Sequence, residues 1–156
     1  HEEVGKGLVV LLVLLLFKKL NLKNALVSGL IVGLSFQVVE DCVYTFQQMF
    51  TAKTDGFATL IERIVHAGGT HWTFSLVFAV GMVASLSKNS GLSKKQGWFW
   101  LSMAVLAHFL LNTPFNAGLT SDTAEVTILM LCFNLCLAIA AFMTVDRIEA
   151  HKEKSA

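Results

Sequence analysis

Residues 25–46 read ALVSGLIVGLSFQVVEDCVYTF, and they decide the class of fold. The stretch begins as a nearly continuous apolar run, and about 20 such residues let a helix cross a bilayer. Two adjacent carboxylates, Glu40 and Asp41, stand where the apolar helix continues. A charge at the centre of a bilayer costs about 2.5 kcal/mol or more, so charged residues in such a helix usually serve a function. The stretch therefore predicts a membrane helix with one part facing a polar site.

The whole chain has the composition of a membrane protein. Of its 156 residues, 54% are hydrophobic and only 15% are charged, whereas a soluble domain has about 25% charged residues. The net charge of +1 provides no basic surface, and we expect no nucleic-acid partner. The three cysteines, Cys42, Cys132 and Cys136, lie inside apolar runs, which indicates buried thiols rather than disulfides.

Five stretches predict an all-α fold, a polytopic membrane helical bundle with about five transmembrane helices. They are residues 4–17, 25–46, 71–86, 98–112 and 126–145. We expect residues 1–145 to form the transmembrane core and residues 146–156 to form a tail. Residue 1 is a histidine followed at once by charged residues, so we expect the chain to lack its own N-terminal portion.

Basic residues gather in alternate connections. They lie in the connection before residue 25, in the connection at residues 87–97, and in the tail. The positive-inside rule places these segments in the cytoplasm. The connections around Asp55 and Asp122 then face the other side. We therefore expect a multi-pass protein of the cell membrane, surrounded by the lipid bilayer, with a cytoplasmic C-terminus.

On this orientation, polar residues from four helices reach the same depth in the outer leaflet. They are Glu2, Glu3 and Lys6, then Glu40 and Asp41, then His66 and His71, and finally His108 and Asn112. Helical spacing places Phe36 and Glu40 on one helix face, and His108 and Asn112 on another. The pattern predicts a shared polar cavity that faces the extracytoplasmic side.

These residues resemble the motifs of the PrsW-type intramembrane proteases. Residues 2–6, EEVGK, resemble the family's EExxK motif, and residues 36–40, FQVVE, resemble its FxxxE motif. Residues 108–112, HFLLN, resemble its HxxxD motif with asparagine in the last place. Residues 63–81 resemble its arginine, spacer, histidine and small-residue helix, and on that spacing His71 matches better than His66. The wider superfamily includes CAAX prenyl endopeptidases and bacteriocin-processing membrane proteases.

The resemblance implies a glutamic intramembrane endopeptidase that cleaves membrane-protein substrates near the extracytoplasmic side, without a metal. The residues implied as catalytic are Glu2, Glu3, Glu40, His71, His108 and Asn112, with Lys6, Phe36 and His66 in support. Glu2 or Glu3 acts as the base on a water, and the sequence leaves open which of the two it is. His108 and Asn112 donate to the oxyanion, and Glu40 and His71 orient the water or shuttle protons.

Three alternatives stay open. Zinc is the chemical alternative, because Glu3, Glu40, His71 and His108 offer nitrogen and oxygen ligands, although the sequence has no HExxH motif. The functional alternatives are a non-catalytic membrane binding protein and an ion- or proton-coupled transporter subunit. A transporter needs polar groups across both leaflets, and the inner half of the predicted bundle is nearly free of ionisable residues.

Overall fold

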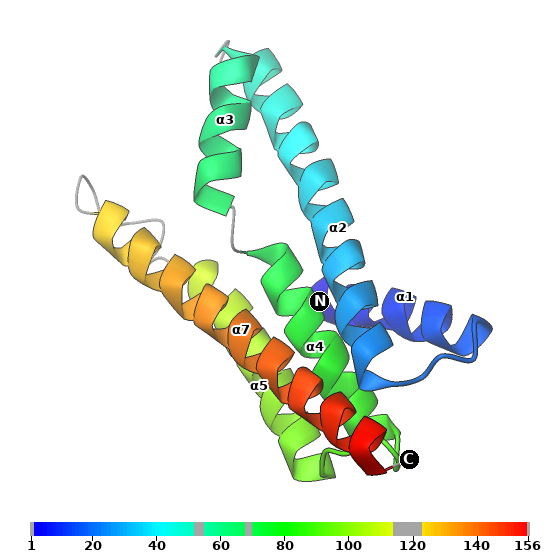
Figure 1. Cartoon of the computed structure of the whole chain (residues 1–156). Coiled ribbons are helices and arrows are strands. Elements are labelled where there is room, and N and C mark those ends of the chain that lie inside the picture. The colour runs from blue at the N-terminus through cyan, green and yellow to red at the C-terminus, as the bar shows by residue number, and fades with distance from the viewer. Residues whose placement is uncertain (1, 52–54, 68–69, 114–122, 156) are drawn as a thin grey trace.

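The computed structural model describes residues 2–51, 55–67, 70–113 and 123–155, and these residues form helices without a strand. The helices are α1 (Glu2–Leu16), α2 (Leu22–Thr51), α3 (Gly56–Ala67), α4 (His71–Leu86), α5 (Lys94–Leu111) and α7 (Thr123–Ser155), as Figure 1 shows. The predicted all-α class is therefore confirmed. The connection around Asp122 belongs in part to residues 114–122, which lie outside the described part of the chain.

Helix α4 is the centre of the bundle, and its most extensive contacts are with α2 and α5. Glycines allow the close approach to α2. A Cβ atom added to Gly29 would lie 2.7 Å from the carbonyl oxygen of Ser75, and one added to Gly33 would lie 2.7 Å from that of His71. Small residues at such spacing let membrane helices pack with their backbones close together. This contact holds the first turns of α4 against the middle of α2.

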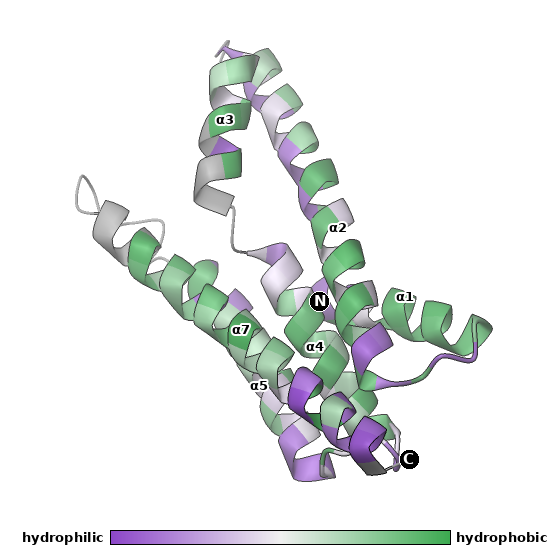
Figure 2. Cartoon of the chain, in the orientation of Figure 1, coloured by the Kyte–Doolittle hydropathy of each residue, from purple (hydrophilic) through white to green (hydrophobic). Residues whose placement is uncertain are grey.

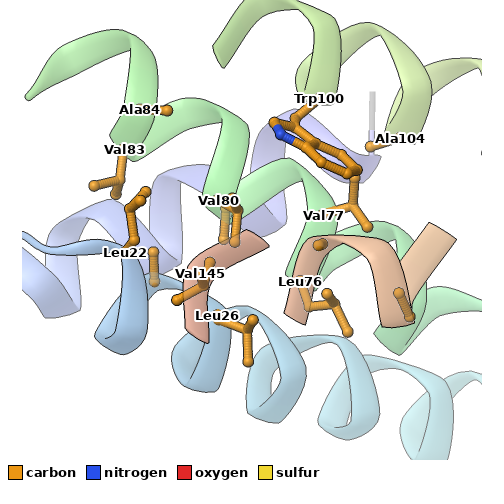
Figure 3. Packing of buried hydrophobic residues seen from close by; sticks show 14 of the residues in the cluster. Leu22, Leu26, Leu76, Val77, Val80, Val83, Ala84, Trp100, Ala104 and Val145 are labelled. Carbon is orange, nitrogen blue, oxygen red and sulfur yellow. The ribbon is translucent and has the colours of Figure 1, made fainter. Parts of the chain in front are cut away.

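The apolar core includes two side chains of α1, Val10 and Leu14, and its larger part lies between α2, α4, α5 and α7. Figure 3 shows Leu22 and Leu26 of α2 close to Val80 of α4 and Val145 of α7, with Trp100 of α5 above Val77. Val77 and Val80 are fully buried, and Trp100 is 8% exposed. Burial of these side chains joins the four helices at one end of the bundle, while the polar residues near the start of α4 lie beyond it.

Among the described residues, two helices are long and apolar enough to cross a membrane, namely Leu22–Thr51 and Ile128–Lys154. The five predicted crossings therefore stay a prediction. The outer surface of the bundle is apolar, because large side chains on α1 such as Leu8 and Leu12 are more than half exposed, and α1 is among the greenest helices in Figure 2. Broad exposed apolar surfaces of this kind are typical of membrane contact.

The structure differs from the sequence-based expectations at three places. The connection around Asp55 contains a helix, α3, which begins where the Asp55 carboxylate accepts a hydrogen bond of 2.9 Å from the backbone N–H of Phe57. The tail continues α7 as a helix to residue 155. The cysteines are free, but the expectation that they are buried is wrong, because all three lie on outward helix faces.

Two basic segments lie at the same end of the bundle, as predicted for segments on one side of a membrane. A Cβ atom added to Gly91, in the connection between α4 and α5, would meet the side chain of Ile148 near the end of α7. Figure 2 shows hydrophilic residues at the start of α5 and at the end of α7. Which side of the membrane this end faces stays a prediction.

Candidate active site and metal centre

Four helices bring the predicted polar residues together. The first turns of α1 contribute Glu2, Glu3 and Lys6, the middle of α2 contributes Phe36 and Glu40, the start of α4 contributes His71, and the end of α5 contributes His108 and Asn112. Helix α1 packs against both α2 and α4. The side chain of His66 lies outside the described residues, so its predicted supporting role is not placed.

Glu3 is the most enclosed carboxylate of the cluster, with 5% of its surface exposed. It forms an ion pair with Lys6, which is equally buried. The hydroxyl of Ser75 donates to Glu3 Oε2 at 3.1 Å, and His108 Nδ1 lies 3.0 Å from Glu3 Oε1. An ionised carboxylate only accepts hydrogen bonds, so a neutral His108 ring that donates to Glu3 carries its proton on Nδ1 and has Nε2 as an acceptor.

Glu40 holds the second histidine in a similar way. Glu40 Oε2 lies 2.8 Å from His71 Nε2, which places the proton of this ring on Nε2 and leaves Nδ1 as an acceptor. Lys6 Nζ lies 3.2 Å from His71 Nδ1 and donates to it. The ring of Phe36 meets the His71 ring edge-on, with centroids 5.1 Å apart. Phe36 thus packs beside His71, and its supporting role stays a prediction.

Glu2 faces the acceptor nitrogen of each histidine. Its Oε2 lies 3.7 Å from His108 Nε2 and 3.9 Å from His71 Nδ1. One ligand atom from each of these three residues lies within 4.8 Å of the others. The Glu2 side chain is 44% exposed, so solvent reaches this carboxylate.

The three residues fit a divalent metal ion. Two imidazoles and one carboxylate are a common protein ligand set for zinc in catalytic sites. Metal-binding histidines usually donate their other ring N–H to a carboxylate or carbonyl, and here Glu40 and Glu3 accept from the far nitrogens of His71 and His108. The zinc ligands expected from the sequence included Glu3 and Glu40. In the structure these two carboxylates contact the ring nitrogens that face away from Glu2, so the candidate ligands are Glu2, His71 and His108. A metal ion bound by His71 Nδ1 would replace the hydrogen bond that this nitrogen accepts from Lys6.

Arg63 of α3 extends the cluster beyond the residues predicted from the sequence. Its Nε donates to Asp41 Oδ1 at 2.9 Å, and its Nη2 lies 3.7 Å from Glu40 Oε2. The guanidinium also lies over the ring of Tyr44, 4.4 Å from the centroid. Asp41 therefore holds the guanidinium of Arg63 near the Glu40 carboxylate, which contacts His71.

Ser75 and Phe74 also belong to the cluster, although the sequence motifs did not predict them. Ser75 follows His71 by four residues and so lies on the same helix face, where it reaches Glu3. Phe74 stacks on the His108 ring at 5.1 Å. The spacing of Ser75 from His71 was the one signal in the sequence that pointed to either residue.

A pocket of about 290 Å³ adjoins Glu2. It is lined by Glu2, Glu3, Val4, Val105, His108, Phe109 and Asn112. Asn112 is exposed at the end of α5, with its side chain in this pocket lining. The pocket gives a substrate access to the carboxylate of Glu2 and to His108.

Comparison with known protein families gives one match. The family model described as PrsW family intramembrane metalloprotease matches residues 1–143. No curated protein and no solved structure matches the chain.

Proposed function

The chain belongs to the PrsW family of intramembrane metalloproteases, and from that premise we propose that it hydrolyses a peptide bond of a membrane protein beside Glu2, His71 and His108. The match covers residues 1–143 and agrees with the motifs read from the sequence. The observation that carries the proposal is the joint geometry of the two histidines. Each turns one ring nitrogen toward Glu2 and the other toward a buried or half-buried carboxylate.

Glu2, His71 and His108 are the proposed ligands of a divalent metal, with zinc the best fit to two nitrogens and one oxygen. A bound zinc ion supplies Lewis acidity, which polarises a carbonyl and lowers the pKa of water to about 7. Glu3 and Glu40 hold the two imidazoles in the tautomers that leave a ring nitrogen free on the side of Glu2. Ser75 and Lys6 in turn hold Glu3.

In the metal-independent alternative Glu2 is the proposed base, because a carboxylate that binds a metal is not free to take a proton. The Glu2 carboxylate faces the pocket and has only long contacts to its neighbours, from 3.7 to 4.0 Å. Glu3 is less suited to this role because Lys6, Ser75 and His108 already engage its two oxygens. In this alternative Glu2 takes a proton from the water that attacks the substrate carbonyl and delivers it to the leaving amine, as peptide hydrolysis requires.

Asn112 is the proposed donor to the substrate carbonyl. It is exposed and lines the same pocket as Glu2 and His108, and an amide N–H directed at a developing oxyanion stabilises the transition state. The proposed substrate is a membrane protein presented near the extracytoplasmic face. This side follows from the distribution of lysine and arginine in the connections.

The test is cleavage of single-pass membrane proteins by the purified chain in lipid vesicles, with products read by mass spectrometry. We expect Glu2→Gln, His71→Ala and His108→Ala each to lower the cleavage rate by about 10²- to 10⁴-fold, the range typical of lost acid–base groups. Glu149→Gln is the matched control, since Glu149 pairs with Lys152 near the end of α7, away from the cluster. If the three cluster variants gave the same products as the Glu149→Gln control, the cleavage would not depend on the cluster. The chain would then be a binding protein rather than a protease.

Metal analysis tests the ligand assignment separately. We expect stoichiometric zinc in the active protein, loss of cleavage on chelation and recovery when zinc is added back. Glu2→Gln and His108→Ala must also lower the zinc content, whereas Glu149→Gln must not. Full cleavage by metal-free protein contradicts the metal assignment and leaves the metal-independent glutamate mechanism.

A further inference from the structure

The pocket beside Glu2 lies between the first turn of α1 and the last turns of α5. Among the described residues, α1 packs against α2 and α4 and has little direct contact with α5. Val105, His108, Phe109 and Asn112 follow one another at helical spacing, so they form one face of α5. The two helices therefore frame an opening that leads to the catalytic cluster.

The opening has an apolar mouth and a polar inner end. Val4, Val105 and Phe109 are between 50% and 65% exposed. His108 and Glu3 are buried, with 9% and 5% of their surfaces exposed. A substrate side chain that passes Val4, Val105 and Phe109 meets apolar surface before it reaches the buried His108 and Glu3.

Aromatic rings pack on the imidazoles away from the pocket. Phe36 and Phe74 lie against His71, with ring centroids 5.1 and 6.3 Å away. Phe74 also stacks on His108. None of the residues that line the pocket belongs to this aromatic group. The pocket between α1 and α5 therefore adjoins Glu2 and His108 on a side that these aromatic rings do not cover.

We propose that this pocket binds one apolar side chain of the substrate, on a residue that flanks the cleaved peptide bond, and that the substrate enters between α1 and α5. Its volume of about 290 Å³ lies at the lower end of ligand pockets, which suits one side chain and its peptide group. Glu3 at the inner end and the more exposed Glu2 both repel an acidic side chain. This inference rests on the proposed protease function, because it assigns specificity to that reaction.

The first test measures selectivity. After the cleavage site is mapped, each flanking substrate residue is changed in turn to Leu, Gly, Asp and Lys. We expect one of the two positions to favour Leu over Gly by at least about tenfold in kcat/KM, since a single methylene in an apolar pocket is worth about 10- to 200-fold. Val105→Trp fills the pocket and must lower this Leu-to-Gly ratio by about tenfold.

Val27→Trp is the control for the first test. Val27 is a similarly exposed valine that lines a separate pocket, near the opposite end of α1. Its substitution must leave the ratio unchanged. An unchanged ratio in Val105→Trp, or a preference for Lys or Asp at both positions, overturns the inference. An absence of cleavage by the unmodified chain is a different result, which contradicts the protease function itself.

The second test does not depend on activity. A photoreactive phenylalanine analogue replaces Phe109 in the Glu2→Gln variant, in vesicles that contain the substrate. We expect crosslinking to the substrate from position 109 and not from position 17. Phe17 is an equally exposed phenylalanine just beyond the end of α1, next to the separate pocket. Equal crosslinking from both positions contradicts entry between α1 and α5.

Discussion

Glu3 Oε1 lies 3.0 Å from His108 Nδ1, and the two residues are 105 positions apart in the chain. This contact joins the first turn of α1 to the last turn of α5, although these helices have little other direct contact among the described residues. Glu3 also pairs with Lys6 and accepts from Ser75. One buried carboxylate thus links three helices and fixes the tautomer of a proposed metal ligand.

Removal of Glu3 is expected to destabilise the fold. Glu3→Ala leaves the ammonium of Lys6 buried without its closest partner, and such a loss costs about 3–5 kcal/mol. The double variant Glu3→Ala/Lys6→Met removes both charges and is expected to be more stable than Glu3→Ala alone. The measurement is detergent-induced unfolding in lipid. Glu149→Ala, which breaks a partly exposed pair with Lys152, is the control and should cost less than about 1 kcal/mol.

Arg63 is expected to position Glu40 rather than to contact the substrate. Arg63→Gln removes the hydrogen bond to Asp41 and the charge beside Glu40. Loss of a group that supports a ligand typically weakens metal binding by about 10- to 100-fold, so we expect a higher zinc Kd and a lower kcat with little change in KM. Arg63→Lys restores the charge and should recover part of the affinity.

The control for Arg63 is Arg147→Gln on α7, where the side chain is exposed. Its zinc Kd and kcat should match those of the unmodified protein. If Arg63→Gln binds zinc normally but has a raised KM, Arg63 contacts the substrate and the positioning role is wrong.

The contact of α2 with α4 is expected to depend on Gly33. A Cβ atom at this position would lie 2.5 Å from Trp72 Cα and 2.7 Å from the carbonyl oxygen of His71, so Gly33→Ala forces the two backbones apart. Overpacking of this kind costs about 1–3 kcal/mol, and it also displaces His71 from Glu40. We expect lower unfolding stability together with lower activity.

Gly5→Ala is the matched control for Gly33, because a Cβ atom at Gly5 would meet nothing within 4 Å. Alanine is favoured over glycine inside a helix by up to about 1 kcal/mol, so this variant should be as stable as the parent or slightly more stable. Equal stability of the Gly33 and Gly5 variants would argue against close packing of α2 on α4.

We expect the buried side-chain amide of Asn134 to lower the free energy of unfolding of the isolated chain. It is 1% exposed, and neither its amide nitrogen nor its amide oxygen has a hydrogen-bond partner in the described structure. A buried polar group without a partner costs about 1–3 kcal/mol, so Asn134→Leu should raise the unfolding stability. Asn24→Leu is the control, because it removes an exposed hydrogen bond to the carbonyl oxygen of Lys19. A loss of stability in Asn134→Leu would indicate that this amide is bonded in the membrane.

The sequence predicted the helical class and the residues of the cluster because both depend on local patterns. Apolar runs of about 20 residues indicate helices, and polar residues that interrupt them stand out against the apolar background. The sequence did not predict helix α3, because residues 56–67 form a short segment of mixed polarity that is typical of a connection. Ser75 was missed because a serine inside an apolar helix carries no charge to mark it.

By itself, the sequence determined that the protein is helical, that its surface is suited to lipid, and that Glu2, Glu3, Glu40, His71 and His108 belong together. Only the tertiary structure decided that Glu2 faces both histidines while Glu3 and Glu40 lie behind them. The reason is physical. Spacing along a helix determines which residues share a face, but the partner of each ring nitrogen depends on the separation and rotation of neighbouring helices, which glycine contacts such as that of Gly33 with α4 establish.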